Sequence, residues 1–142
     1  MANAEKLPCI GDVYFMRFSG ERNEQSGWRP GLVFQNNTGN TYSPNIIALP
    51  LTSSLKKLGQ PTHVVLPAAA TGLSRDSMVL GEKPERMSKD RVGRYITTLP
   101  DDFMVQIAIA SLLATSAISF LNPEDLLSVW QQARSLNAVF TA

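Results

Sequence analysis

The sequence predicts an α+β fold in which a small, strongly curved antiparallel sheet or barrel is followed by C-terminal helices. Two observations carry this prediction. Short runs rich in β-branched and aromatic residues occupy the first hundred residues, separated by polar segments that contain Gly, Pro and Asn. After Pro100 the pattern changes to longer runs of strong helix formers. Strands first and helices last indicate segregated elements rather than alternating βαβ units.

The strands are expected in six runs, at residues 12–18, 30–35, 45–51, 62–66, 77–81 and 91–97. The first run is apolar on both faces, so we expect it to be covered on both sides. Pro30 is confined to the start or edge of the second. The polar segments 19–28 and 36–44 are expected to be loops, and the first is longer than a tight hairpin needs, which is typical of functional loops.

Two helices are expected in the last third of the chain. The first begins at residues 100–102, where a Pro and two acids suit the first turn, and continues through 103–118. Apolar residues surround most of its circumference, so it must be covered on more than one side. The run approaches the length of a membrane span, but its Ala and Ser content favours a buried helix. The second helix is N-capped by Asn122 and runs to about residue 135.

The length of 142 residues suits one domain with one core. We divide the chain into a leader of residues 1–10, a domain of residues 11–120 and a helical extension of residues 121–142. The apolar side of the extension is expected to pack on the domain or on a partner. It can cover the preceding helix, a binding partner or a second subunit, and the sequence leaves these alternatives open.

The charges are distributed unevenly along the chain. Residues 1–99 carry 12 Lys/Arg and 8 Asp/Glu, a net charge of +4, whereas residues 100–142 carry 1 and 4, a net charge of −3. The whole chain is only +1, so it is not a polycation that coats nucleic acid. A polyanion is therefore expected to meet the first two thirds of the chain.

Several kinds of site are excluded by composition. A single Cys and a single His leave no zinc site of the usual kinds, and no GxxxxGK[ST] phosphate loop is present. His63 has no motif that would support a Ser-His-Asp triad and is interpreted as structural. One unpaired thiol and no signal-peptide pattern favour the cytoplasm, with no membrane partner.

Arg29 and Thr52 are the strongest candidates for chemistry. Arg29 can clamp a phosphate in a bidentate manner, and Thr52 can donate a hydroxyl hydrogen bond to the same group. Taken alone, an Arg after a loop is usually a surface charge, and a Thr-Ser-Ser run is usually a turn. If the second and third strands are neighbours, we expect the two residues at opposite ends of antiparallel strands or at the same end of parallel ones.

An ordered series of short motifs surrounds these residues. They are Gly11-Asp12-Val13-Tyr14, Glu24-Gln25-x-Gly27-x-Arg29-Pro30, Gln35-Asn36, Gly39-Asn40, Ser43-Pro44, Thr52-Ser53, Pro61-Thr62-His63-Val64, Gly72-Leu73-x-Arg75-Asp76-Ser77 and Glu82. With them the chain resembles the MazF/PemK ribonuclease toxins from about residue 11 to about residue 119. Each piece alone means little, whereas the full set in this order is specific.

The resemblance implies an SH3-like barrel with a C-terminal helix, a homodimer, and cleavage of single-stranded RNA at short preferred sequences without a metal or other cofactor. It also implies a cognate MazE-like antitoxin that covers the RNA groove. Arg29 and Thr52 take the places of the family's catalytic pair. Glu24 takes the place of the base that some members use.

The implied chemistry is coherent, because the ribose 2′-OH serves as an internal nucleophile that the enzyme must position. Arg29 suits the charge that develops on the phosphate, and its high intrinsic pKa makes it a poor base. Thr52 would orient the phosphate, and Glu24 is the candidate general base. The expected products carry 2′,3′-cyclic phosphate and 5′-OH ends.

Weaker candidates extend this site. The RNA-binding candidates are Trp28, Gln35, Asn36, Ser53, Lys56, Lys83 and Arg86. Trp28 and Tyr42 can stack on bases or pack in the core. Gln35 and Asn36 can read base edges or serve turn hydrogen bonds. Arg75 and Asp76 are interpreted as a local ion pair rather than an RNA contact.

One segment departs from the pattern of a standard member. Lys83-Pro84-Glu85 replaces the residues that many members carry after Glu82, and we expect Pro84 to disturb strand pairing there.

The competing functions are a non-enzymatic toxin on the same barrel, like the CcdB-type gyrase poisons, and a catalytically decayed member that acts as a binding module. The presence of both Arg29 and Thr52 argues against the gyrase poison.

Overall fold

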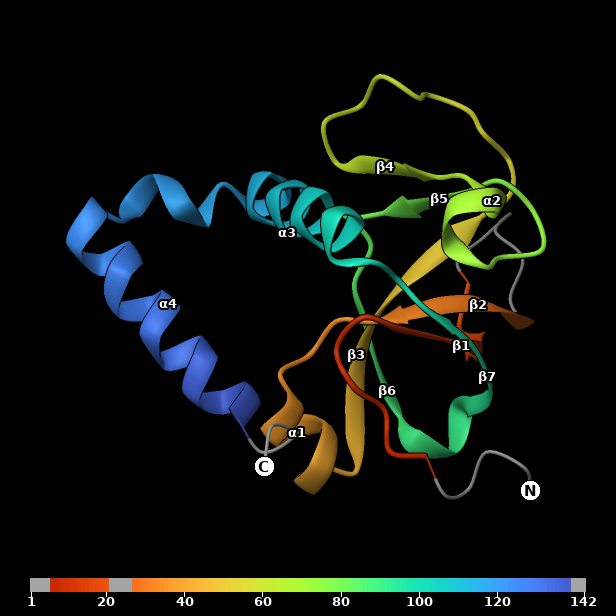
Figure 1. Ribbon diagram of the computed structural model, residues 1–142, viewed down its shortest axis with the longest axis horizontal. Helices are drawn as coiled ribbons and strands as arrows, with labels where there is room; N and C mark the ends of the chain where they lie inside the picture. The colour runs from red at the N-terminus through yellow and green to blue at the C-terminus, as the bar shows by residue number, and fades with distance from the viewer. Residues whose placement is uncertain (1–5, 21–26, 139–142) are drawn as a thin grey trace.

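The computed structural model describes residues 6–20 and 27–138 (Figure 1). Its strands are β1 (Asp12–Phe18), β2 (Gly27–Val33), β3 (Asn45–Thr52), β4 (His63–Leu66), β5 (Ser77–Leu80), β6 (Glu85–Ser88) and β7 (Val92–Thr98). Its α-helices are α1 (Asn37–Tyr42), α2 (Ala68–Thr71), α3 (Asp101–Thr115) and α4 (Pro123–Asn137), with short 3-10 helices at Lys89–Arg91 and Ala117–Phe120. The predicted α+β class, with an antiparallel sheet before C-terminal helices, is confirmed.

The sheet is organised around β3, the longest strand, which pairs with three neighbours. The strand order is β4-β5-β3-β2-β1-β7, with β6 also paired to β3, and every pairing is antiparallel. The first half of β3 pairs with β6, whereas its last two residues pair with β5. This change of partner along one strand bends the sheet (Figure 1). Among the described residues, no pairing joins the edge strands β4 and β7.

Two apolar clusters hold the sheet together. One lies between the sheet and α3 and includes Leu32, Leu51, Val79 and Ile107. The other lies on the opposite face of the sheet and includes Tyr14, Met16, Phe18 and Ile46. Each fully buried side chain of this size stabilises the fold by about 1.5–3 kcal/mol relative to exposure. On β1 the face of Tyr14, Met16 and Phe18 is buried, whereas on the other face Val13 is buried, Phe15 is half-buried and Arg17 is exposed. The expectation that β1 is covered on both sides therefore holds only for the start of the strand.

The segment predicted as a second loop contains α1, so that prediction is wrong for residues 37–42. Asn36 is the N-cap and accepts a hydrogen bond from the Gly39 N–H at 2.9 Å. The fully buried Asn40 donates to the Gln35 carbonyl at 2.8 Å. Side-chain amides thus supply the partners that backbone groups at the ends of a one-turn helix lack.

Strand β6 was not predicted, and its position contradicts the expectation for Pro84. Residues 85–88 pair with β3 in four consecutive register positions directly after Pro84. A Pro at this point removes no ladder hydrogen bond, because it precedes the first paired residue. Pairing with the bent β3 gives this short segment its strand conformation.

The two C-terminal helices begin where predicted. Helix α3 follows Pro100 with Asp101 and Asp102 in its first turn. Helix α4 is capped by a reciprocal box, in which Asn122 accepts from the Asp125 N–H at 2.9 Å and Asp125 accepts from the Asn122 N–H at 3.1 Å. Within the part of the chain that the structure describes, no helix is long and apolar enough to cross a membrane.

The expectation that the apolar helix is covered on more than one side is wrong for this chain taken alone. Ile107 and Ala110 of α3 are buried against the sheet. The opposite side of the same helix exposes large apolar side chains, namely Val105, Ile109, Leu112 and Leu113. The apolar residues around α3 therefore form two faces, of which one packs on the core.

Candidate active site

Arg29 and Thr52 lie at the same end of neighbouring antiparallel strands. Strand β2 pairs with β3 so that Gly31 is opposite Pro50. Extending this register by two residues sets Arg29, near the start of β2, opposite Thr52, the last residue of β3. The expectation that antiparallel pairing would separate them is wrong, because the start of one antiparallel strand lies beside the end of its neighbour.

The two residues share a pocket of about 370 Å³. Its lining is formed by Phe15, Arg29, Pro30, Leu51, Thr52, Ser53, Ser74, Arg75 and Ser77. Two guanidinium-bearing side chains and three Ser residues thus line one open concavity with Thr52. Such a combination of positive charge and hydroxyl donors suits a phosphate group.

The hydroxyl of Thr52 is held by the turn that follows β3. Its Oγ1 accepts a hydrogen bond from the Ser54 N–H at 3.1 Å. This contact uses an oxygen lone pair and leaves the hydroxyl proton available to donate, because a hydroxyl carries one donor and two acceptor positions. Thr52 is therefore oriented as a donor toward whatever occupies the pocket.

The guanidinium of Arg29 lies beside an aromatic ring. Its Cζ lies 5.4 Å from the centroid of the Phe18 ring, within cation–π distance. Its Nε is buried and has no hydrogen-bond partner among the described residues. Buried polar groups are nearly always paired, so an unpaired donor on a cation indicates a place for an anionic partner.

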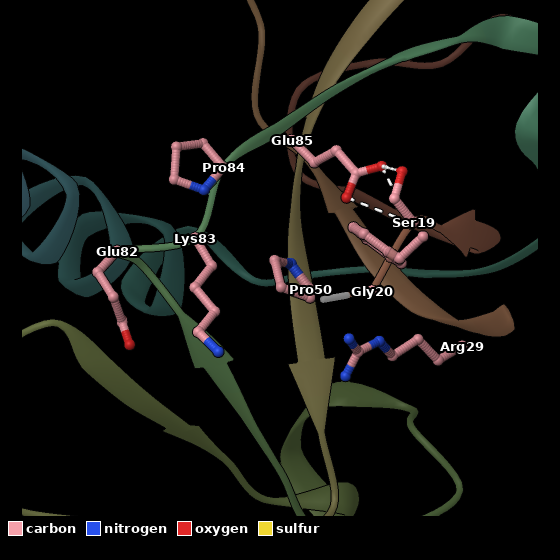
Figure 2. Close-up of a pocket in the computed structure, with 9 residues that line it drawn as sticks. Ser19, Gly20, Arg29, Pro50, Glu82, Lys83, Pro84 and Glu85 are labelled. Atoms are coloured by element: carbon pink, nitrogen blue, oxygen red, sulfur yellow. Dashed lines mark hydrogen bonds between the residues drawn. The ribbon is translucent and has the colours of Figure 1, made fainter. Parts of the chain in front are cut away.

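Arg29 also lines a second pocket, of about 490 Å³, shown in Figure 2. In this view Arg29 and Lys83 extend into the same space from opposite sides. The acids of this pocket are already engaged. Glu85 accepts from the Ser19 hydroxyl at 3.0 Å and from Arg91 at 2.7 Å, which holds the end of β1 against β6.

Glu82, the other acid of this pocket, is paired with His63. The His63 Nε2 and Glu82 Oε2 atoms lie 2.9 Å apart, and His63 Nδ1 lies 3.1 Å from the Lys57 carbonyl. Burial raises the pKa of Glu82, but hydrogen bonds from His63, the backbone and Thr62 outweigh this effect and hold the pKa below its usual value. His63 is thus a structural residue that joins β4 to the segment after β5, in agreement with its interpretation from the sequence.

A third pocket, of about 320 Å³, adjoins the central pocket. It shares Phe15, Pro30, Ser74, Arg75 and Ser77 with the Arg29–Thr52 pocket. Arg94 stacks on the Phe15 ring, with its Cζ 4.4 Å from the ring centroid. The central and third pockets share these five residues, and the central pocket shares Arg29 with the pocket of Figure 2, so we refer to the three together as the groove.

The remaining predicted residues lie in different places. Ser53 lies in the central pocket and Lys83 in the pocket of Figure 2. Gln35 donates to Asn40 and to the Asn45 carbonyl, so it and the capping Asn36 serve α1. Glu24 lies outside the described residues. The others have exposed side chains and are not in the linings of these pockets, namely Trp28, Tyr42, Lys56 and Arg86.

Sequence reasoning assigned Arg75 to a different role. Asp76 accepts a hydrogen bond from the Ala68 N–H at 2.8 Å, and in the described part of the chain it makes no ion pair with Arg75. Arg75 lines both the central and the third pocket instead. Phe15 was missed as a groove residue, because β1 and β7 are far apart in the sequence and only their pairing brings Phe15 beside Arg94.

Comparison with known proteins identifies similar chains. A family model described as PemK-like, MazF-like toxin of type II toxin–antitoxin systems matches residues 10–113. Endoribonuclease EndoA of Bacillus subtilis (strain 168) is 39% identical over 111 residues, which are 78% of this chain and 96% of the relative. Endoribonuclease MazF of Staphylococcus saprophyticus is 37% identical over 98 residues, or 68% of this chain and 82% of the relative.

Solved structures have the same fold. An endoribonuclease from a mycobacterial species, solved in complex with its cognate antitoxin, is 25% identical with a TM-score of 0.63, and the match covers 78% of this chain and 96% of that one. A MazE–MazF crystal structure (Form-II) from Deinococcus radiodurans is 25% identical with a TM-score of 0.64, covering 80% and 99%. Helix α4 lies beyond the residues that the family model matches.

Proposed function

Because the chain belongs to the PemK-like, MazF-like toxin family of type II toxin–antitoxin systems, we propose that it is an endoribonuclease that cleaves single-stranded RNA in the groove around Arg29 and Thr52. The observation that carries the proposal is the shared pocket of these two residues. Both belong to the motifs that resemble the family, and both line one concavity.

The proposed chemistry is attack of the ribose 2′-OH on the adjacent phosphorus with departure of the 5′ oxygen. The reaction builds negative charge on the phosphoryl oxygens, and Arg29 and Arg75 supply the preorganised positive charge. Thr52 donates to one phosphoryl oxygen and fixes its orientation. The 2′-OH proton passes to a base, for which Glu24 remains our candidate, and the 5′ oxygen is protonated as it leaves. The products carry 2′,3′-cyclic phosphate and 5′-OH ends.

The groove on both sides of the scissile phosphate suits flanking nucleotides. The Phe15–Arg94 stack in the third pocket offers a surface on which a base can stack. Lys83, in the pocket of Figure 2, can contact the RNA backbone on the other side of Arg29. Single strands are bound by this combination of aromatic and basic side chains. Trp28, Ser53, Lys56 and Arg86 remain candidates for contacts along this path.

The wider assembly follows from family membership. We propose that the sheet forms the SH3-like barrel of these toxins, that the chain acts as a homodimer, and that a MazE-like antitoxin inhibits it in the cytoplasm by covering the groove. Two of the similar structures are complexes, one of an endoribonuclease with its cognate antitoxin and one of MazE with MazF. Cleavage at short preferred sequences and independence from metal ions belong to the same proposal.

Incubation of the purified chain with a long single-stranded RNA in excess EDTA tests the proposal. Wild type should cut at a few sites and leave cyclic phosphate ends. Arg29→Ala should not cut, whereas Arg17→Ala, which removes an exposed cation outside all three pockets, should cut normally. Intact RNA with the wild-type chain would instead favour a binding module or a gyrase poison, which a supercoiling assay identifies.

A further inference from the structure

The ring of His63 lies between two groups that accept hydrogen bonds and have no proton to donate. Its side chain is buried, with 6% exposed, and its Nε2 atom lies 2.9 Å from Glu82 Oε2. Its Nδ1 atom lies 3.1 Å from the Lys57 carbonyl oxygen. The lowered pKa of Glu82 favours the ionised carboxylate, which, like a carbonyl, only accepts. A neutral imidazole carries one N–H and satisfies one of these contacts, whereas the imidazolium satisfies both.

The Lys57 carbonyl belongs to the loop of residues 53–61, which follows Thr52 directly. Every residue of this loop is exposed, so hydrogen bonds rather than apolar packing hold it. Lys57 has a φ of +55°, which is uncommon for a residue other than Gly and persists only where the surrounding structure imposes it. Its carbonyl accepts from the Gln60 N–H at 3.2 Å and lies against the His63 ring. The ring therefore helps to impose the conformation of the loop.

A series of hydrogen bonds connects this part of the loop with Thr52. The Ser54 N–H donates to Thr52 Oγ1 at 3.1 Å. The Ser54 carbonyl accepts from the Lys56 N–H at 3.0 Å, one residue before Lys57. Because these bonds are consecutive along the chain, a tether on Lys57 restricts the positions open to Ser54. It thereby restricts the orientation of the Thr52 hydroxyl, which lines the central pocket.

The elements packed around the ring carry few titratable groups. Strand β5, which pairs with β4, contains none. Helix α3 also packs on β4 and presents Ala110 beside Gly81, while its two acids are confined to its first turn. The titratable side chains of the loop, of the segment after β5 and of α3 are Lys56, Lys57, Glu82, Lys83, Asp101 and Asp102. Among the described residues, Glu82 is the acid that contacts the ring.

We propose that His63 is a positioning residue for Thr52. Its imidazolium form ties the loop to Glu82, and loss of a ring proton releases one of the two contacts. Histidine changes its charge between about pH 5 and 8, so the loop should be held more firmly at the acidic end of this range. The effect on cleavage rests on the proposed function, whereas the pH-dependent hold on the loop does not.

NMR of the full chain tests this hold directly, because His63 is the single histidine. Long-range proton–nitrogen spectra report the protonation of both ring nitrogens, and heteronuclear NOE values report the order of the backbone at residues 53–60. Both ring nitrogens should carry protons at the acidic end, with an ordered loop. Loss of one ring proton should lower the NOE values of the loop with the same midpoint. Loop order that does not change at this midpoint would overturn the proposal, whether or not the chain cuts RNA.

The matched variant for this measurement is Glu82→Gln. Its amide N–H can donate to an unprotonated Nε2, so a neutral ring keeps both contacts. Loop order in this variant should therefore no longer follow pH. A loop that loses order in Glu82→Gln as it does in wild type would contradict the tether between His63 and Glu82.

Single-turnover cleavage of a short RNA tests the effect on Thr52. The ratio of the wild-type rate to the Glu82→Gln rate should fall about tenfold from acidic to basic pH, with the midpoint of the ring, because one hydrogen bond is lost. In a Thr52→Val background no hydroxyl remains to be positioned, so the same ratio should stay constant. A constant ratio with Thr52 present would overturn the positioning role. No cleavage by wild type would refute the proposed function and with it the role for Thr52, while the NMR measurement would still decide the hold on the loop.

Discussion

Arg29 and Thr52 are brought together by the β2–β3 register, in which Gly31 lies opposite Pro50 and the two candidate residues follow two positions further along. The strand order makes this contact possible, because β3 continues past its pairing with β2 to meet β5. The central pocket therefore lies where the sheet bends, and its residues come from strands on both sides of the bend.

The first prediction concerns the guanidinium of Arg29. Arg29→Ala should lower the single-turnover cleavage rate about 10²–10³-fold, the usual cost of removing one donor to developing charge. Arg29→Lys keeps the charge but not the planar guanidinium, so its cleavage rate should lie between those of wild type and Arg29→Ala. Because Arg29→Ala loses the contact with the Phe18 ring but no hydrogen bond at Nε, its melting temperature should fall only slightly. Wild-type activity in Arg29→Ala would remove Arg29 from the mechanism.

The second prediction separates the hydroxyl of Thr52 from its shape. Thr52→Ser keeps both the acceptor for the Ser54 N–H and the donor toward the pocket, so cleavage should stay within a few-fold of wild type. Thr52→Val keeps the shape of the side chain but loses both the acceptor and the donor of the hydroxyl. The cleavage rate should therefore fall at least tenfold with little change in substrate affinity. Comparison of kcat with KM on a short RNA checks this, and equal rates for Ser and Val would exclude the hydroxyl role.

The third prediction follows from the lowered pKa of Glu82. A carboxyl whose pKa is lower in the folded state stabilises the fold fully above its unfolded value of about 4.5. That contribution is lost as the pH falls through the lower folded pKa. Urea unfolding between pH 3 and 7 should therefore show a smaller acid-dependent loss of stability for Glu82→Gln than for wild type. Identical pH profiles would show that the His63–Glu82 contact contributes nothing.

The fourth prediction tests the packing beneath Arg29. A Cβ on Gly31 would lie 2.6 Å from the Met16 sulfur and 2.7 Å from the Phe18 ring. Gly31→Ala should lower the free energy of unfolding by about 1–3 kcal/mol through overpacking. Displacement of Phe18 should also reduce cleavage, since its ring supports Arg29. Gly59→Ala meets nothing within 4 Å and is the matched control, whose thermal unfolding should match wild type.

The fifth prediction concerns the cap of α4. Asn122→Ala removes the side-chain oxygen that accepts from the Asp125 N–H, while the backbone N–H of residue 122 can still donate to Asp125, and should destabilise the helix by about 1 kcal/mol. Because α4 is exposed along its length, amide exchange should accelerate within α4 while the sheet keeps its protection. Uniformly faster exchange throughout the chain would show instead that α4 and the sheet unfold as one unit.

Sequence periodicity was sufficient for most of the fold. The strands and both long helices lie close to their predicted bounds, and the Asn122 cap is present. The exceptions are short segments whose conformation depends on distant partners. Helix α1 depends on side-chain amides, and β6 depends on pairing with β3.

For the candidate site, the sequence by itself determined that Arg29 and Thr52 are the residues to consider, because their motifs are local and ordered along the chain. Only the tertiary structure decided that the two share a pocket, that Arg75 joins them and that Phe15 and Arg94 extend the groove. It also decided which face of α3 packs on the core. The physical reason is that propensity and capping act over a few residues, whereas strand register, sheet bending and the choice of buried face depend on contacts between distant segments.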